Sequence, residues 1–108
     1  MLVLNAEIYF FTQEESKDAL PRDLKTGGHL RPAVNFGNDL LFSGEINVNE
    51  SIDTIQRGNY YEAIVWMPTI ENEAYGMIKD LLKNGNAIKL QSASKIIGKG
   101  KILNFMYV

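Results

Sequence analysis

The sequence predicts an all-β protein, a small antiparallel β-barrel that spans residues 1–108 as one domain, with one inserted helix near residues 72–83. Three observations predict this fold. Short segments of alternating apolar and polar residues recur along the chain, turn residues separate them, and only one segment has apolar residues at helical spacing. In addition, Gly98 and Gly100 lie inside the last strand segment, as glycines do where a strand bends or lets another backbone come close.

Five segments alternate with the period of a β-strand. They cover residues 4–11, 30–36, 40–48, 60–67 and 87–103, the last with a break at residues 92–94. The second and third segments flank a turn at residues 37–39 and therefore predict an antiparallel hairpin. The polar segment 12–28 predicts a long connection, in which Thr12 and Glu15 have the spacing of a capping box.

Large apolar side chains that share one parity within a strand are expected to face the core. The residues expected to be largely buried are Phe42, Ile46, Ile64, Trp66, Ile96 and Ile102. Tyr60 and Tyr61 are expected to pack in the core with Trp66. The alternative for these three rings is stacking on nucleobases.

A helix is expected from Asn72, which can cap its start, to Lys83, which suits its end. Its apolar stripe consists of Tyr75, Ile78, Leu81 and Leu82. We expect this stripe to cover an open end of the barrel. The alternative is that it presents an apolar face to a partner.

Charge is distributed unevenly along the chain, although the net charge is only −2. Residues 1–78 hold 5 Lys and Arg against 12 Asp and Glu, whereas residues 79–108 hold 6 Lys against Asp80 alone.

The absence of cysteine excludes a disulfide framework and a thiolate metal site. The N-terminal residues do not resemble a signal peptide and no apolar run has transmembrane length, so we expect a cytoplasmic protein without membrane contact.

The last strand carries the candidate binding surface. Its three lysines share one parity, opposite to that of the glycines, and are therefore expected on the outer face together with Ile97. The candidate binding residues are Arg31, Lys95, Ile97, Gly98, Lys99, Gly100 and Lys101. The alternative is that acidic residues of a neighbouring strand, such as Glu45, Glu50 or Asp53, neutralise the lysines.

No residue pattern points to a catalytic residue, a cofactor, a metal or a nucleotide. The single histidine, His29, has no second histidine or cysteine with which to share a metal. Glu45 and Glu62 could pair as carboxylates across strands, but a glycosidase would also need them in a cleft. No helix follows Gly98 and Gly100, so they are not a dinucleotide-binding loop. We therefore expect no enzyme and no GTP or ATP binding; an unrecognised catalytic site is the least favoured alternative.

Three motifs in this order resemble the C-terminal β-barrel domain, domain 3, of translation elongation factor Tu. They are Gly28-His29-Leu30-Arg31-Pro32, Arg57-Gly58-Asn59 followed by Trp66-Met67-Pro68, and Ile97-Gly98-Lys99-Gly100-Lys101-Ile102. The resemblance spans roughly residues 5–104 and implies a stand-alone barrel without the GTPase domain. In that family the barrel helps to hold aminoacyl-tRNA, which implies a tRNA stem as one partner. The helix near residues 72–83 looks like an insertion.

These observations predict a non-catalytic interaction module that binds another protein, since enzyme motifs are missing and the sequence pI is acidic. The alternative is a translation-related RNA-binding module that uses the basic strand over residues 95–101. The sequence leaves the identity of the partner and the oligomeric state open.

Overall fold

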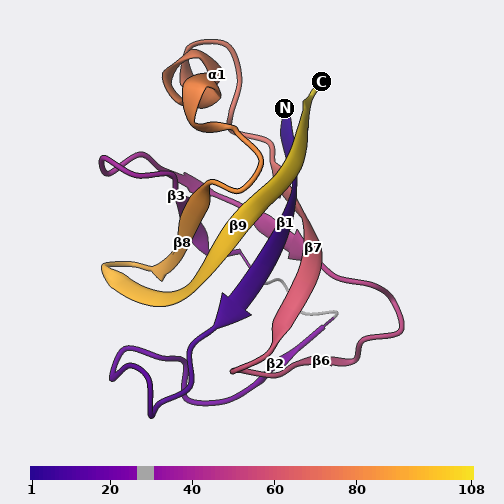
Figure 1. Cartoon of the computed structure of the whole chain (residues 1–108), viewed down its shortest axis with the longest axis vertical. Coiled ribbons are helices and arrows are strands. Elements are labelled where there is room, and N and C mark those ends of the chain that lie inside the picture. Colours follow the sequence, from indigo (N-terminus) through magenta and orange to yellow (C-terminus); the bar gives the residue numbers. More distant parts are fainter. Residues whose placement is uncertain (27–30) are drawn as a thin grey trace.

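A row of apolar side chains in β1 (Leu2–Phe10) forms the centre of the fold in the computed structural model, which describes residues 1–26 and 31–108. The inward residues of β1 are Leu2, Leu4, Ala6, Ile8 and Phe10, all almost completely buried. Strict alternation places them on one face. β1 pairs antiparallel with β7 (Tyr60–Met67) on one side and with β9 (Lys95–Tyr107) on the other (Figure 1). Its apolar row therefore lies in the middle of the core.

The other strands complete a nearly closed antiparallel barrel around this row. They are β3 (Ala33–Asn35), β4 (Leu41–Ser43), β5 (Glu45–Asn47) and β8 (Ala87–Ser92). The order in the sheet is β4-β3-β8-β9-β1-β7-β5. A separate two-stranded sheet of β2 (Leu24–Lys25) and β6 (Thr54–Ile55) lies at the bottom of Figure 1. The predicted fold class is confirmed for the part of the chain that the structure describes.

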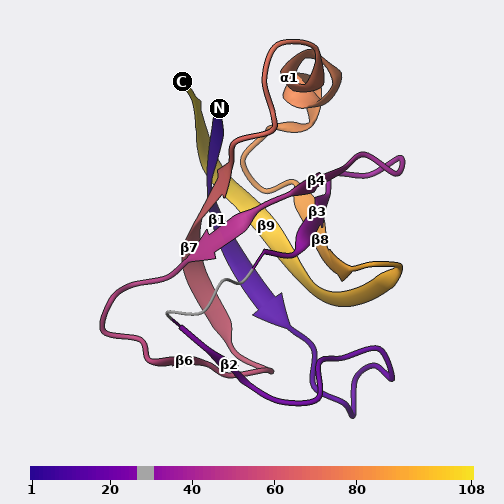
Figure 2. The same ribbon diagram turned by 180° about the vertical axis from the view of Figure 1, so that it is seen from behind.

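Gly44 closes the barrel. β4 and β5 lie at opposite edges of the sheet, yet Gly44 is the only residue between them in the chain. Figure 2 shows the chain running from β4 toward β7 at this point. The Gly44 N–H donates to the carbonyl oxygen of Pro32 at 3.0 Å, and a Cβ on Gly44 would lie only 2.8 Å from Cγ1 of Val65. The single strand predicted over residues 40–48 is therefore two strands, although its predicted alternation is kept.

The prediction of which face of β7 is buried is wrong. Ile64 and Trp66 are 39% and 44% exposed, and Tyr60 is exposed as well, whereas Val65 faces the core. Val65 lies opposite an inward residue of β1, and directly opposite residues of antiparallel strands share a face. Both faces of β7 carry apolar side chains, so alternation alone does not show which face is buried. Tyr61 packs against the core as expected.

A bulge in β9 reverses the predicted position of Ile97. The pairing of β9 with β8 shifts by one residue at this point and leaves Ile97 as the extra residue. Its side chain is turned to the core and is only 3% exposed, so the prediction of an outer position is wrong. Ile46 and Ile102 are buried as predicted, whereas Phe42 and Ile96 are only half-buried.

The predicted helix is present but shorter than expected. It consists of α1 (Glu73–Ile78) and a 3₁₀ turn, η1 (Lys79–Leu81). The side chain of Asn72 makes no capping hydrogen bond; instead the backbone N–H of Asn72 donates to the Tyr107 hydroxyl at 2.9 Å. The Tyr107 ring stacks on Tyr75, with ring centroids 3.8 Å apart, and Ile78 and Leu82 are buried in the core. The helix therefore packs on its own barrel, at the end where the termini lie (Figure 1).

The turns lie where the sequence predicts them. Residues 37–39 all have positive φ, and β8 and β9 meet at a turn in which Ala93 has a φ of 53°. The strand predicted over residues 30–36 is present from Ala33 to Asn35, while Leu30 and His29 lie outside the described residues. Among residues 1–26 and 31–108, no helix has the length and apolar character needed to cross a membrane.

Replacing Gly98 by alanine tests the close contact between β9 and β1. A Cβ at this position would lie 2.5 Å from the carbonyl oxygen of Tyr9 and 3.3 Å from Cα of Phe10, which are backbone atoms that cannot rotate away. We expect Gly98→Ala to lower the free energy of unfolding by about 1–3 kcal/mol in urea denaturation. The control is Gly76→Ala in α1, which meets no atom within 4 Å outside its own helix and should raise this free energy by up to about 1 kcal/mol. Equal stability of the two variants would contradict the close contact.

Candidate functional site

The candidate site lies on the outer face of the sheet from β8 to β7. The pairing register arranges its side chains in rows across the strands. The rows are Lys89–Lys99–Tyr9–Tyr60, Ala87–Lys101–Glu7–Glu62, Asn104–Asn5–Ile64 and Met106–Val3–Trp66. We call the first the lysine–tyrosine row. It is separated from the apolar row that ends at Trp66 by about 20 Å, given the rise per residue of a strand.

Lys99 is held beside two aromatic rings in the lysine–tyrosine row. Its Nζ lies 5.1 Å from the ring centroid of Tyr9 and 5.9 Å from that of Tyr60. The centroids of the two rings are 4.7 Å apart. Cation–π attraction therefore helps to fix the ammonium group on the outer face.

Glu15 fixes the position of Tyr9. The Tyr9 hydroxyl donates to both carboxylate oxygens of Glu15 at 2.8 Å, and Thr12 donates to Oε1 through its N–H at 2.9 Å and its hydroxyl at 3.0 Å. The hydrogen bonds from the Thr12 N–H and from Tyr9 lower the pKa of the Glu15 carboxyl, while the hydrogen bond to Glu15 raises the pKa of Tyr9. The predicted capping-box pair is thus used in a turn that anchors this row.

Lys89 lies directly opposite Lys99 on neighbouring strands. Like charges in this arrangement destabilise a sheet. Ion pairs within 4 Å in the described part of the chain join the N-terminus to Glu71, Arg31 to Glu45 and Arg57 to Asp23. None of these pairs includes a lysine, so the alternative, in which Glu45, Glu50 or Asp53 neutralises the basic strand, is not found among these residues.

Part of the predicted binding set gathers at a shallow hollow on the outer face. Lys99, Gly100 and Lys101 line it together with Glu7 and Tyr60, and its volume is about 200 Å³. Glu7 lies opposite Lys101 in the register. The hollow is therefore basic on the side of β9 and carries one carboxylate from β1.

The other predicted residues lie elsewhere. Arg31 and Ile97 line a separate cavity of about 330 Å³, while Lys95 is exposed where β9 begins. Gly98 is buried against β1. Lys89 was not among the predicted residues, although the alternation of β8 around it and the register of a short hairpin with β9 were signals that could have identified it.

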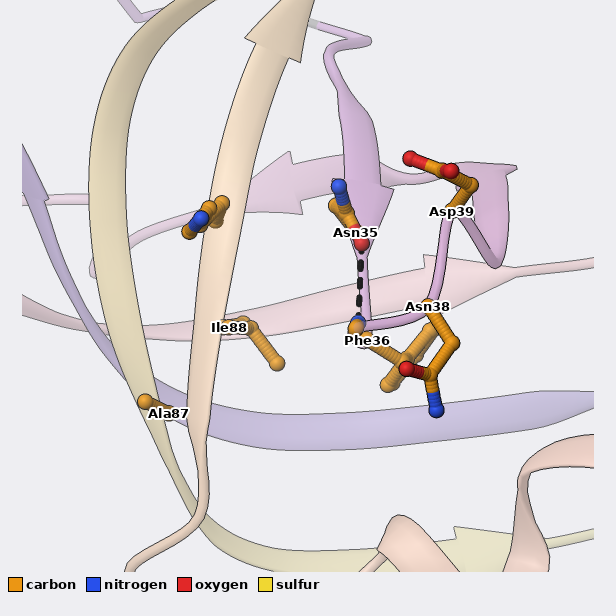
Figure 3. Close-up of a pocket in the computed structure, with 8 residues that line it drawn as sticks. Asn35, Phe36, Asn38, Asp39, Ala87 and Ile88 are labelled. Atoms are coloured by element: carbon orange, nitrogen blue, oxygen red, sulfur yellow. Dashed lines mark hydrogen bonds between the residues drawn. The ribbon is translucent and has the colours of Figure 1, made fainter.

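Lys89 also lines a cavity of about 240 Å³ beside the turn between β3 and β4 (Figure 3). The Gly37 N–H donates to Oδ1 of Asn35 at 2.8 Å and holds this turn, while Ile88 lines the cavity from β8. Asp39 lines the same cavity, but the ion pairs found in residues 1–26 and 31–108 do not include one between Asp39 and Lys89. Lys89 therefore borders a polar turn, and its ammonium group forms no ion pair with the residues that the structure describes.

Within the described ranges, no three His, Cys, Asp or Glu side chains gather closely enough to hold a metal ion. Comparison with protein-family models and with curated proteins gives no match for this chain. Function is therefore inferred from the geometry and charge of the outer face.

Replacing Glu15 by glutamine tests the anchor of Tyr9. Because the carboxylate raises the pKa of Tyr9, Glu15→Gln should lower this pKa toward its ordinary value of 10.0, as followed by NMR of the Tyr9 ring against pH. Folding lowers the pKa of Glu15 below its ordinary value of 4.5, so its contribution to stability is present above that value and is lost as the pH falls through the lowered pKa. The difference in unfolding free energy between wild type and variant should therefore vanish in acid. An unchanged titration of Tyr9 would contradict the anchor.

Proposed function

We propose that this chain is a non-catalytic interaction module that binds an acidic segment of another protein through the lysine–tyrosine row. The observation that carries this proposal is the direct opposition of Lys89 and Lys99 without an ion pair to either among the described residues. Two opposed like charges destabilise the sheet, whereas an acidic partner lying over both is attracted by each. Local features that lower stability are typical of functional sites, and the rest of the fold compensates for them.

The surroundings of the two lysines suit a protein partner. Tyr60 is 57% exposed, and tyrosine is enriched in the residues that dominate binding at protein interfaces. The contacts of Tyr9 with Lys99 and with Glu15 hold the row in place before binding, which reduces the entropy lost on association. An acidic segment can therefore contact both lysines and pack on Tyr60.

RNA is the second candidate, because lysines beside an exposed tyrosine ring also suit a nucleic-acid strand. Kinship with domain 3 of elongation factor Tu, which we propose on the three motifs and the barrel fold, favours the same candidate. However, the sequence pI of about 5.3 differs from the basic pI typical of nucleic-acid-binding domains. A protein partner is therefore favoured.

Exchanging Lys89 for glutamate separates binding from stability. Lys89→Glu places an opposite charge across from Lys99, so we expect the free energy of unfolding in urea to rise by about 0.2–1 kcal/mol. The same change should weaken the captured complex, because one of the two attractive charges becomes repulsive. Affinity capture from a native extract with the wild type and the variant, followed by separate analysis of bound protein and bound RNA, measures this second effect.

The matched control is Lys83→Glu, an equal change of charge at an exposed position beyond the helix. It should leave capture unchanged. Equal capture by the two variants would count against the lysine–tyrosine row as the binding surface. If the captured material is RNA, and its affinity falls steeply as the salt concentration rises, the partner is RNA and not an acidic protein segment.

A further inference from the structure

A second hollow lies on the outer face where the chain leaves β5, toward the apolar end of the sheet. Its volume is about 640 Å³, and small-molecule sites measure roughly 300–1,000 Å³. We call it the amide trough. β1 and β7 contribute Asn5, Glu62, Ile64 and Trp66, and the end of β5 and the residues after it contribute Asn47 and Asn49.

The amide trough offers hydrogen-bond donors and acceptors without a cation. Its three asparagine amides each provide a donor and an acceptor, Glu62 adds acceptors, and the described residues that line it include no lysine or arginine. Trp66 and Ile64 are partly exposed and add apolar surface. A fitting ligand therefore has many hydroxyl groups, no negative charge and at least one apolar face.

Several of these polar atoms have hydrogen-bonding capacity left. Nδ2 of Asn5 donates to Oε1 of Glu62 at 3.2 Å, whereas Oδ1 of Asn5 is buried and has no partner among the residues described. Asn49 uses its Oδ1 to accept from the Ser51 N–H at 2.9 Å, which keeps its NH₂ group for other partners. The NH₂ group of Asn49 can therefore donate to a ligand, and Glu62 can accept from one.

We infer that the amide trough binds a neutral oligosaccharide. A sugar hydroxyl donates and accepts at once, so it can satisfy a carboxylate oxygen and an amide together. The C–H face of a sugar ring can pack on the indole of Trp66 as another apolar surface would. A phosphate or carboxylate ligand would instead meet Glu62 without a compensating cation, and a protein anchor residue prefers a deeper, more apolar pocket.

Trp66 is the only tryptophan of the chain, so its indole N–H gives one unambiguous NMR signal. We would titrate the ¹⁵N-labelled protein at millimolar concentrations of cellotetraose, maltotetraose and chitotetraose. At least one of these sugars should produce saturable shifts of the indole N–H and of the side-chain amides of Asn5, Asn47 and Asn49. The backbone amide of Gly100, which lies in the other hollow, should not shift.

Two results would overturn the inference. One is the absence of such shifts with all three sugars. The other is a response to an uncharged peptide of Asn, Gln and Ser without a response to any sugar, which would assign the trough to an extended peptide.

Two variants locate the site and keep it separate from the proposed function. Asn47→Ala, at an exposed position, should weaken sugar binding about fivefold, as the loss of one hydrogen bond does. Lys99→Glu, in the lysine–tyrosine row, should leave the sugar affinity unchanged but abolish binding of the proposed protein partner. Wild-type sugar affinity in Asn47→Ala, or its loss in Lys99→Glu, would show that the sugar does not bind in the amide trough.

Discussion

Close packing of other parts of the chain against glycines is the constraint on which the barrel depends. At Gly44 the chain crosses between the two edges of the sheet, and at Gly98 and Gly100 β9 presses against carbonyl oxygens of β1. At each of the three positions an added Cβ would lie within 2.8 Å of a neighbouring atom. A small barrel curves tightly, and that curvature needs residues without side chains where strands bend or meet. The core, the helix at one end and the rows of the outer face all require this curved sheet.

The strands were largely predictable from the sequence because alternation and turn residues are local signals. The buried face of β7 was not, because both of its faces carry apolar residues and the choice is made by β1 across the sheet. The inward position of Ile97 could not be predicted either, because the bulge that turns it inward depends on the pairing of β9 with β8. The division of the predicted strand 40–48 into β4 and β5 at Gly44 results from closure of the barrel, which is a property of the whole sheet.

The candidate site was only partly predictable for the same reason. The lysines of β9 stand out in the sequence, but their relation to Lys89 depends on the pairing of β8 with β9. The contact of Tyr9 with Glu15 depends on how the chain turns after β1, and the amide trough combines residues from β1, β5 and β7. Sequence patterns identify which side chains leave a strand on the same side, whereas the register decides which of them meet across strands.

The position of β1 in the sheet also affects how the chain can fold. Leu2 pairs with Met67 on one side and with Tyr107 on the other, so the first strand finds both of its neighbours in the second half of the sequence. Contacts between such distant residues form slowly, because the entropy of closing long loops is lost before the contacts stabilise the chain. During synthesis on the ribosome, the apolar row of β1 has no paired neighbour until β7 has emerged, and it lacks its second neighbour until β9 has emerged. In that interval, chaperones or other unfolded chains can bind the strand that later becomes the centre of the barrel.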